Sequence, residues 1–164
     1  MKKITRRTAI RGAAGAATLT FVAGCLGDDD DDGDDGDDRS PEEIAVDWVD
    51  AADNVDSEDD ITDLTGEDSI EISNGDTGDG GNYIFDPGIA RIDAGTEVTW
   101  VWTTSGHDVT EVSGEGETIS GWDDESSQQG DGHEHSTTFD DSGVALYECA
   151  AHRGQNQRGA VIVE

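Results

Sequence analysis

Hydrophobic and polar residues alternate with a period of two over several short stretches from residue 69 to residue 164. This alternation is typical of β-strands, in which successive side chains point to opposite faces. Clusters of glycine, aspartate and serine, such as residues 74–82 and 114–121, separate the stretches and favour turns. The predicted strands are residues 69–73, 97–103, 107–112, 137–139, 144–148 and 159–164. Short strands spaced in this way predict an all-β Greek-key sandwich.

Two stretches indicate which strand faces lie in the core. Trp100 and Trp102 share one face of the strand at residues 97–103, and their large apolar area favours burial over contact with a cofactor. Tyr147 and Cys149 likewise share a face, so we expect Cys149 to point inward.

Residues 41–52 show helical spacing instead. Ser40 and Glu43 have the spacing of a capping box, and Pro41 stands at the first helical position. We therefore expect a short amphipathic helix that packs on the main domain. Its apolar face consists of Ile44, Ala45, Trp48, Val49 and Ala52.

The first 25 residues form a basic segment that contains no acidic residue. Its weakly apolar part, residues 12–24, has 13 residues, whereas a spanning helix needs about 20. A removable export signal is therefore favoured over a permanent anchor helix. Arg6 and Arg7, preceded by Thr5, resemble a twin-arginine signal.

Residues 22–25 (VAGC) resemble the lipobox of secreted lipoproteins. This motif makes Cys25 the predicted lipidated first residue of the mature chain, on the extracytoplasmic face of the cell membrane. An ordinary signal peptide that is cut elsewhere is the alternative.

Residues 28–38 (DDDDDGDDGDD) have no apolar side chain to bury, which predicts a disordered tether. Together these features divide the chain into four parts. They are an export signal (1–24), a lipidated cysteine with an acidic tether (25–39), a short helix with a connector (40–66) and a β-domain (67–164).

The charge of the chain excludes some partners. The whole chain has 9 basic and 40 acidic residues, a net charge of −31, and loss of residues 1–24 removes five basic residues and leaves −36. Such a charge argues against nucleic acids, because phosphate binding needs a basic face. It suits a halophilic protein, since at 1 M salt the Debye length of about 3 Å screens self-repulsion.

Cys25 and Cys149 are the two cysteines of the chain, so lipidation of Cys25 leaves Cys149 without an intramolecular partner. Cys149 and His152 are spaced Cys-x-x-His, and thiolate with imidazole suits copper, zinc and iron. A third ligand must come from elsewhere. The candidates are His107, at the start of a predicted strand, and His133 and His135, which we expect to be plain surface residues in an exposed loop.

Several motifs resemble the halocyanin and plastocyanin branch of the type 1 blue-copper proteins, which have a cupredoxin-like fold. The resemblance implies one copper ion held in a near-trigonal plane by His107, Cys149 and His152. It also implies a monomer that carries single electrons between redox proteins of a membrane chain, and that is not an enzyme. The motifs are residues 63–66 (DLTG), 80–87 (GGNYIFDP), 93–96 (DAGT), 105–110 (SGHDVT), 147–152 (YECAAH) and 159–163 (GAVIV).

The chain departs from the family pattern near the axial ligand. Met1 is the only methionine, and Gln157 occupies the place of the axial methionine, with Asn156 beside it as the alternative. Glutamine is a weak axial ligand in some His₂Cys copper sites, as in stellacyanin-like proteins. Because an amide oxygen is a harder donor than a thioether, we expect Gln157 to lower the reduction potential.

Two neighbouring positions also differ from the family. Asp108 replaces the asparagine that usually follows the first histidine, so it can accept hydrogen bonds from backbone N–H groups but cannot donate when ionised. Ala151 replaces the proline that often precedes the second histidine. Both changes can loosen or retune the site.

Other functions remain open at this point. The missing methionine also suits a lipoprotein that sequesters copper or zinc on the same fold. A metal-free, adhesion-like β-sandwich is the other alternative, with Cys149 as an inert core residue. A catalytic pair of Cys149 and His152 is less favoured, because no motif for an oxyanion hole accompanies them.

Overall fold

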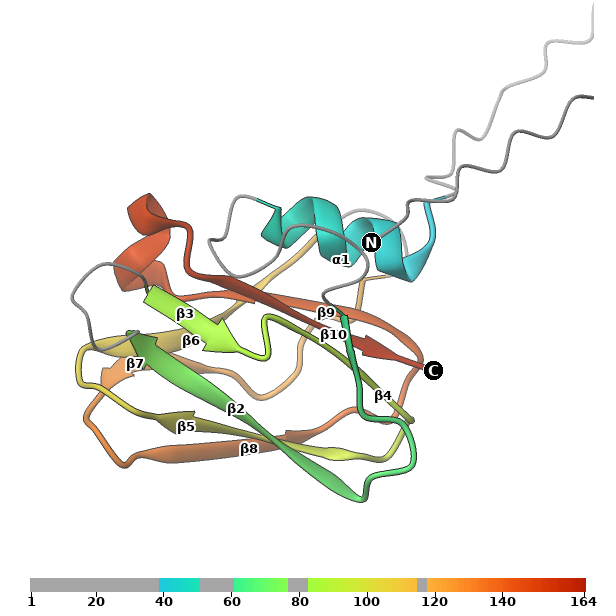
Figure 1. Cartoon of the computed structure of the whole chain (residues 1–164), viewed down its shortest axis with the longest axis horizontal. Coiled ribbons are helices and arrows are strands. Elements are labelled where there is room, and N and C mark those ends of the chain that lie inside the picture. Colours follow the sequence, from blue (N-terminus) through green and yellow to red (C-terminus); the bar gives the residue numbers. More distant parts are fainter. Residues whose placement is uncertain (1–38, 51–60, 77–82, 115–117) are drawn as a thin grey trace, which may run out of the picture. The chain divides into compact units, whose positions relative to one another are not determined.

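The computed structural model describes residues 39–50, 61–76, 83–114 and 118–164. These residues form two β-sheets and a short helix (Figure 1). The predicted export signal, Cys25 and most of the acidic tether lie outside the described residues.

The two sheets contain six and four strands. Non-consecutive strands are neighbours in both, and the predicted all-β sandwich is confirmed. The larger sheet has the order β1 (Ile61–Asp63), β4 (Ile89–Ile92), β10 (Arg158–Val163), β9 (Gly143–Glu148), β6 (His107–Val112) and β7 (Glu125–Gln129). The smaller sheet has the order β3 (Tyr83–Asp86), β2 (Ser69–Asp76), β5 (Glu97–Trp102) and β8 (Glu134–Thr138).

The main core contains side chains from both sheets. Trp100 and Trp102 on β5 are buried, as their shared face predicts. The Trp100 ring lies edge-on to Tyr147 of β9, with ring centroids 5.3 Å apart, so the two sheets meet through aromatic contacts. Cys149 belongs to the same buried cluster, which confirms its inward direction.

The helix α1 (Pro41–Val49) begins with the predicted capping box, in which Ser40 and Glu43 exchange backbone-to-side-chain hydrogen bonds. Its buried face covers the outer face of β9 and β10 (Figure 1). The Trp48 indole donates to the Tyr147 carbonyl at 3.1 Å, and the Arg158 guanidinium lies 4.5 Å from the centroid of the Trp48 ring. Among the described residues, no helix is long and apolar enough to cross a bilayer.

The helix also accounts for a second cluster of buried side chains, separate from the main core. Because α1 covers one face of β9 and the main core covers the other, all six residues of β9 are buried. The cluster consists of Ile44, Ala45, Val49, Ile89, Val144, Leu146, Ala160 and Ile162.

Four strands were not predicted, namely β1, β3, β4 and β7. The sequence of β7, ESSQQ, has no apolar residue, since this strand lies at an edge of the larger sheet with much of its surface exposed. The loop predicted around His135 is wrong for the same reason. His135 lies within β8, an edge strand whose polar residues hid its periodicity.

Candidate metal centre

The candidate ligands come from the ends of three adjacent strands of the larger sheet. His107 begins β6, Cys149 follows β9, and Gln157 directly precedes β10. A 3₁₀-helix, η2 (Ala150–Gln155), connects β9 to β10 and carries His152. Since β9 runs antiparallel to both β6 and β10, the start of β6, the end of β9 and the start of β10 lie at the same end of the sheet. The ligand atoms of His107, Cys149 and His152 lie within 4.8 Å of one another.

His107 is buried, and both its backbone and its ring make polar contacts. Its backbone carbonyl accepts a hydrogen bond of 2.7 Å from the Trp102 indole. Its Nε2 lies 3.1 Å from the Thr104 hydroxyl, which directs Nδ1 toward Cys149, where Sγ lies 3.9 Å away. Without a bound ion, Nδ1 carries the ring proton and donates a hydrogen bond to the Gln157 oxygen at 2.9 Å. In the other tautomer Nε2–H donates a hydrogen bond to the Thr104 hydroxyl, and Nδ1 offers a lone pair to a metal ion.

The Cys149 side chain is fully buried, and its Sγ lies 3.3 Å from His152 Nδ1. The Asp108 backbone N–H donates to the sulfur at 3.4 Å. Burial raises the pKa of the Cys149 thiol to about 11, and the nearby Asp108 carboxylate acts in the same direction. The thiol therefore holds its proton at neutral pH until a cation displaces it.

His152 is the candidate ligand nearest the surface, since its side chain is half-buried. Its backbone N–H donates to the Cys149 carbonyl at 2.9 Å, which closes the turn between the two ligands. Partial burial, and then the proximity of His107, lower the pKa of His152. The imidazole is therefore neutral at neutral pH, which is the form that binds metals.

Gln157 is fully buried beside these residues. Its Oε1 lies 2.9 Å from His107 Nδ1, and its amide nitrogen donates to Asn74 Oδ1 at 2.9 Å and to the Ile84 carbonyl at 3.0 Å. Asn156, the alternative, has a φ of 57° at the end of η2 and serves the turn. The structure thus brings Gln157 to the site.

The Asp108 carboxylate is buried and connects the two ligand loops. Its Oδ1 accepts hydrogen bonds from the Ala150 N–H at 2.7 Å and the Thr110 hydroxyl at 2.8 Å. Its Oδ2 accepts from the Ala151 N–H at 3.2 Å and lies 3.6 Å from Cys149 Sγ. The carboxylate accepts backbone hydrogen bonds, as predicted for this position, and places a negative charge beside the sulfur.

Two residues of the site were missed by the sequence analysis. Asn74 is fully buried beside Gln157, although it was assigned to a turn cluster. Its period-two spacing from Ile70 and Ile72 places it on the inward face of β2 and could have identified it. Tyr83 stacks on His152 with ring centroids 4.0 Å apart, and no sequence pattern marks this contact.

The other two histidines lie away from this cluster. The His133 and Trp102 rings form a T-shaped pair with centroids 4.9 Å apart, and His133 Nε2 lies 3.6 Å from the Glu125 carboxylate. His135 Nε2 lies 2.8 Å from the Asp123 carbonyl. Both side chains are half-buried; His135 lies in β8, and His133 directly precedes this strand. Neither belongs to the group of side chains that could hold a metal ion.

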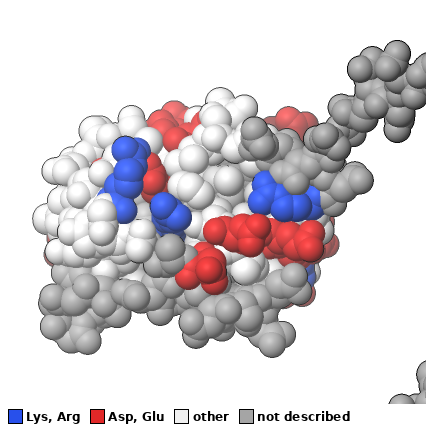
Figure 2. Space-filling model, turned by 90° about the horizontal axis from the view of Figure 1, so that it is seen from above, with Lys and Arg blue, Asp and Glu red and all other residues white. Residues whose placement is uncertain are grey.

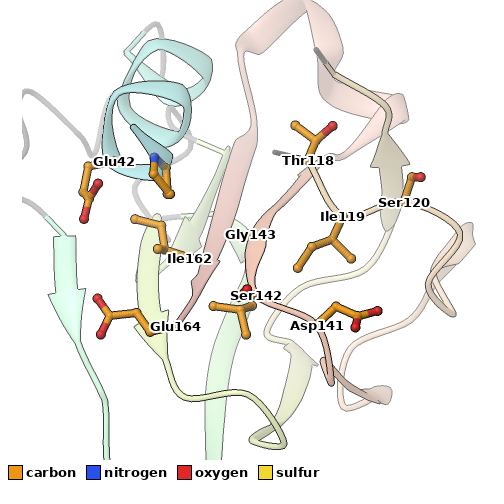
Figure 3. Close-up of a pocket in the computed structure, with 11 residues that line it drawn as sticks. Glu42, Thr118, Ile119, Ser120, Asp141, Ser142, Gly143, Ile162 and Glu164 are labelled. Carbon is orange, nitrogen blue, oxygen red and sulfur yellow. The ribbon is translucent and has the colours of Figure 1, made fainter. Parts of the chain in front are cut away.

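A pocket of about 530 Å³ lies at the opposite end of β10 (Figure 3). Its lining includes Glu42, Asp141 and Glu164 together with Ile119 and Ile162, and none of the candidate ligands. The length of β10 puts it about 20 Å from the candidate metal centre. Glu42 and Glu164 both pair with Arg91, so these carboxylates are already engaged.

Comparisons with known proteins point to copper. Residues 72–164 match the family described as copper-binding proteins of the plastocyanin/azurin family. The chain is 44% identical over 101 residues to halocyanin from Natronomonas pharaonis, an alignment that covers 61% of this chain and 59% of halocyanin. The chain thus spans less than two thirds of that relative.

Solved structures include similar folds. A copper-containing nitrite reductase from Thermus scotoductus superposes with a TM-score of 0.51 at 16% identity, covering 66% of this chain and 29% of the reductase. Pseudoazurin from Methylobacterium extorquens gives a TM-score of 0.48 at 28% identity, covering 58% of this chain and 75% of pseudoazurin. The nitrite reductase comparison shows a shared fold.

Proposed function

The chain belongs to the plastocyanin/azurin family of copper-binding proteins, and we propose that His107, Cys149 and His152 hold one type 1 copper ion with Gln157 as a weak fourth ligand. In this proposal the protein is a one-electron carrier that exchanges electrons with redox partner proteins. The expected fold and the family resemblance are confirmed, and the cofactor of the family is copper.

One observation carries the proposal, namely that two imidazole nitrogens and a thiol sulfur converge within 4.8 Å. Imidazole with thiolate suits copper, and the burial of His107 and Cys149 keeps water from the thiol. The residues therefore fit the ion. Bound copper supplies one-electron redox chemistry by cycling between Cu(I) and Cu(II).

The surrounding residues hold these donors in place. The Thr104 hydroxyl contacts the His107 ring, the Trp102 indole bonds the His107 backbone, and Asp108 binds the backbone of η2 that carries His152. A site held from several sides needs little rearrangement when its charge changes, which favours fast electron exchange. Gln157 offers an amide oxygen rather than a thioether, so we expect a lower reduction potential than in a methionine-ligated relative.

Electrons would enter and leave near His152, because this ring is half-buried whereas His107 and Cys149 are buried. The exposed residues of η2 are Ala150, Ala151, Arg153, Gly154 and Gln155. Arg153 pairs with the buried Glu148 carboxylate. Among the described residues in the left-hand part of Figure 2, where η2 lies in Figure 1, most are uncharged, and basic side chains lie beside an acidic one. A partner can approach there without meeting strong repulsion.

The location of the protein is part of the proposal. The lipobox-like residues 22–25 support a lipid anchor on Cys25, and the acidic run at 28–38 supports a tether. The protein would then work as a monomer on the extracytoplasmic face of the cell membrane, in a membrane electron-transfer chain. The net charge of −31 supports a high-salt environment.

The test is the visible absorption spectrum of the chain in molar salt after addition of Cu(II), with Cys149→Ser as the control. A type 1 site gives an intense blue band that comes from the copper–thiolate bond, and the control lacks it. A colourless wild-type protein, or a band that survives in Cys149→Ser, contradicts the proposal.

The oxygen donor of Gln157 favours a second candidate, a protein that sequesters copper or zinc. An electron carrier must cycle reversibly, whereas a sequestering protein need only bind tightly. Cyclic voltammetry of the copper-loaded chain distinguishes the two, because reversible one-electron waves support the carrier. Irreversible waves together with tight zinc binding support sequestration.

A further inference from the structure

The side-chain amide of Gln157 is buried and contacts a polar group at each end. Its oxygen faces His107 Nδ1 at 2.9 Å, and its nitrogen faces Asn74 Oδ1 and the Ile84 carbonyl. Because an amide can rotate by 180° and exchange its oxygen and nitrogen, something must determine which atom faces the metal ligands.

The Ile84 carbonyl fixes one end of this amide. A backbone carbonyl only accepts hydrogen bonds, so the Gln157 end that lies 3.0 Å from it must be the NH₂ group. Ile84 lies on β3, which is paired with β2 in register, so this carbonyl cannot turn away.

Asn74 fixes the same end from a second side, provided that its own amide is oriented. The Asn74 Nδ2 donates at 3.3 Å to the backbone carbonyl of Asp108, which again only accepts. This contact leaves Asn74 Oδ1 facing Gln157. A reversed Gln157 would place its oxygen against two other oxygens, Asn74 Oδ1 and the Ile84 carbonyl, in a buried site where such an arrangement is costly.

Asn74 is itself rigidly placed. It is fully buried on β2, and its backbone carbonyl accepts a hydrogen bond of 2.9 Å from the Thr103 N–H. Its side chain reaches from the smaller sheet to Asp108 and Gln157, which belong to the larger sheet or its loops. The Asp108 carbonyl of the larger sheet thus orients the Asn74 amide. The Asn74 oxygen and the Ile84 carbonyl of the smaller sheet then orient the Gln157 amide.

We propose that Asn74 is a positioning residue that presents the oxygen of Gln157, and not its nitrogen, to the copper site. This inference rests on the proposed function and deepens it. An oxygen is a hard donor that favours Cu(II) over Cu(I). Asn74 therefore sets the relative affinity for the two oxidation states without contacting the metal.

The test is a double-mutant cycle of Asn74→Leu in two backgrounds, wild type and Gln157→Met. Leucine has the branching of asparagine but no polar atom, and a thioether has no amide to orient. The ratio of Cu(II) to Cu(I) affinity should fall about tenfold in the wild-type background, which equals a rise of about 59 mV in potential. It should stay unchanged in the Gln157→Met background.

The control is Ser73→Ala, since Ser73 is the neighbour of Asn74 on β2 and the alternation of the strand turns it to the other face. This variant should leave the affinity ratio unchanged. An unchanged ratio in Asn74→Leu, or the same shift in both backgrounds, overturns the positioning role.

A second measurement uses the wild-type chain without copper, so it does not depend on whether a variant folds. NMR hydrogen exchange of the Gln157 side-chain amide in the wild-type chain should be slow, since its NH₂ group donates to two buried acceptors. Rapid exchange overturns the inference. A chain that gives slow exchange but no blue band supports the orientation of Gln157 and ends the proposed electron-carrier function.

Discussion

The rings of Tyr83 and His152 are stacked, with centroids 4.0 Å apart and planes inclined by 9°. Tyr83 lies on β3 of the smaller sheet, whereas His152 lies on η2 next to the larger sheet. The contact therefore covers one face of the half-buried candidate ligand with a residue from the other sheet. It restrains the His152 ring at the point where electrons are proposed to leave.

Replacing Tyr83 with alanine should weaken copper binding about 2- to 10-fold, because an aromatic pair contributes about 0.5–1.5 kcal/mol beyond its buried area. Titration of the copper-loaded protein with a competing chelator measures the loss. Tyr83→Phe keeps the ring and is expected to bind copper as tightly as wild type. Equal affinity of all three proteins would show that the stacking does not hold His152.

Gly159 lies against Tyr147, and a Cβ atom at this position would overlap the aromatic ring. Gly159→Ala should therefore destabilise the fold by about 1–3 kcal/mol, since Tyr147 is fully buried and has little room to shift. Urea unfolding measures the change. Gly154→Ala is the matched control, because a Cβ there meets nothing within 4 Å. Similar unfolding midpoints for the two variants would refute the predicted overlap.

Metal binding should become tighter as the pH rises. Burial raises the pKa of the Cys149 thiol to about 11, so below this pH an ion must displace the thiol proton. The pKa of His152 is lowered, and above pH 7 its protonation therefore competes little. The apparent affinity for Zn(II), which avoids thiol oxidation, should rise about tenfold per pH unit between pH 7 and 9.

Isothermal titration calorimetry between pH 7 and 9 measures how the affinity for Zn(II) changes with pH. Cys149→Ser lacks the titrating thiol and is expected to lose most of the affinity and the slope together. A wild-type affinity that stays constant above pH 7 would mean that the thiol is already ionised or takes no part in binding.

The positions of the candidate ligands could be predicted from the sequence where these residues lie in or next to strands with clear alternation. The inward direction of Cys149 follows from the alternation of β9, and the Cys-x-x-His spacing places His152 on the same turn. His107 begins a strand that pairs antiparallel with β9, which brings it to the end of the sheet where Cys149 lies. Local pattern and sheet pairing agree here, so the sequence was informative.

The remaining features depend on contacts between distant segments. Asn74 was hidden because the glycine and aspartate that follow it suggest a turn, whereas pairing with β3 and β5 extends β2 to Asp76. The edge strand β7 lacks apolar residues and gives no alternation to detect. The stacking of Tyr83 on His152 joins residues 69 positions apart, and neither local sequence indicates it.

Asp108 places a carboxylate oxygen 3.6 Å from Cys149 Sγ, in a buried position. Its two oxygens accept hydrogen bonds from the Ala150 and Ala151 N–H groups, which fixes their position relative to the sulfur. A negative charge at this distance stabilises the more positive oxidation state of a bound ion. The carboxylate should therefore lower the reduction potential, in the same direction as the Gln157 oxygen.

Asp108→Asn removes this charge and should raise the potential by roughly 100 mV. Unit charges about 4 Å apart interact by about 4 kcal/mol at an effective dielectric constant of about 20, and about 1.4 kcal/mol equals about 59 mV for one electron. Screening by solvent and the loss of the Ala151 hydrogen bond make the shift in potential smaller than this energy alone would give. Protein-film voltammetry in molar salt measures the shift.

Asp141→Asn makes the same charge change at the exposed rim of the distant pocket (Figure 3) and should shift the potential little. Equal shifts in the two variants would mean that the potential responds to net charge and not to the carboxylate beside the sulfur.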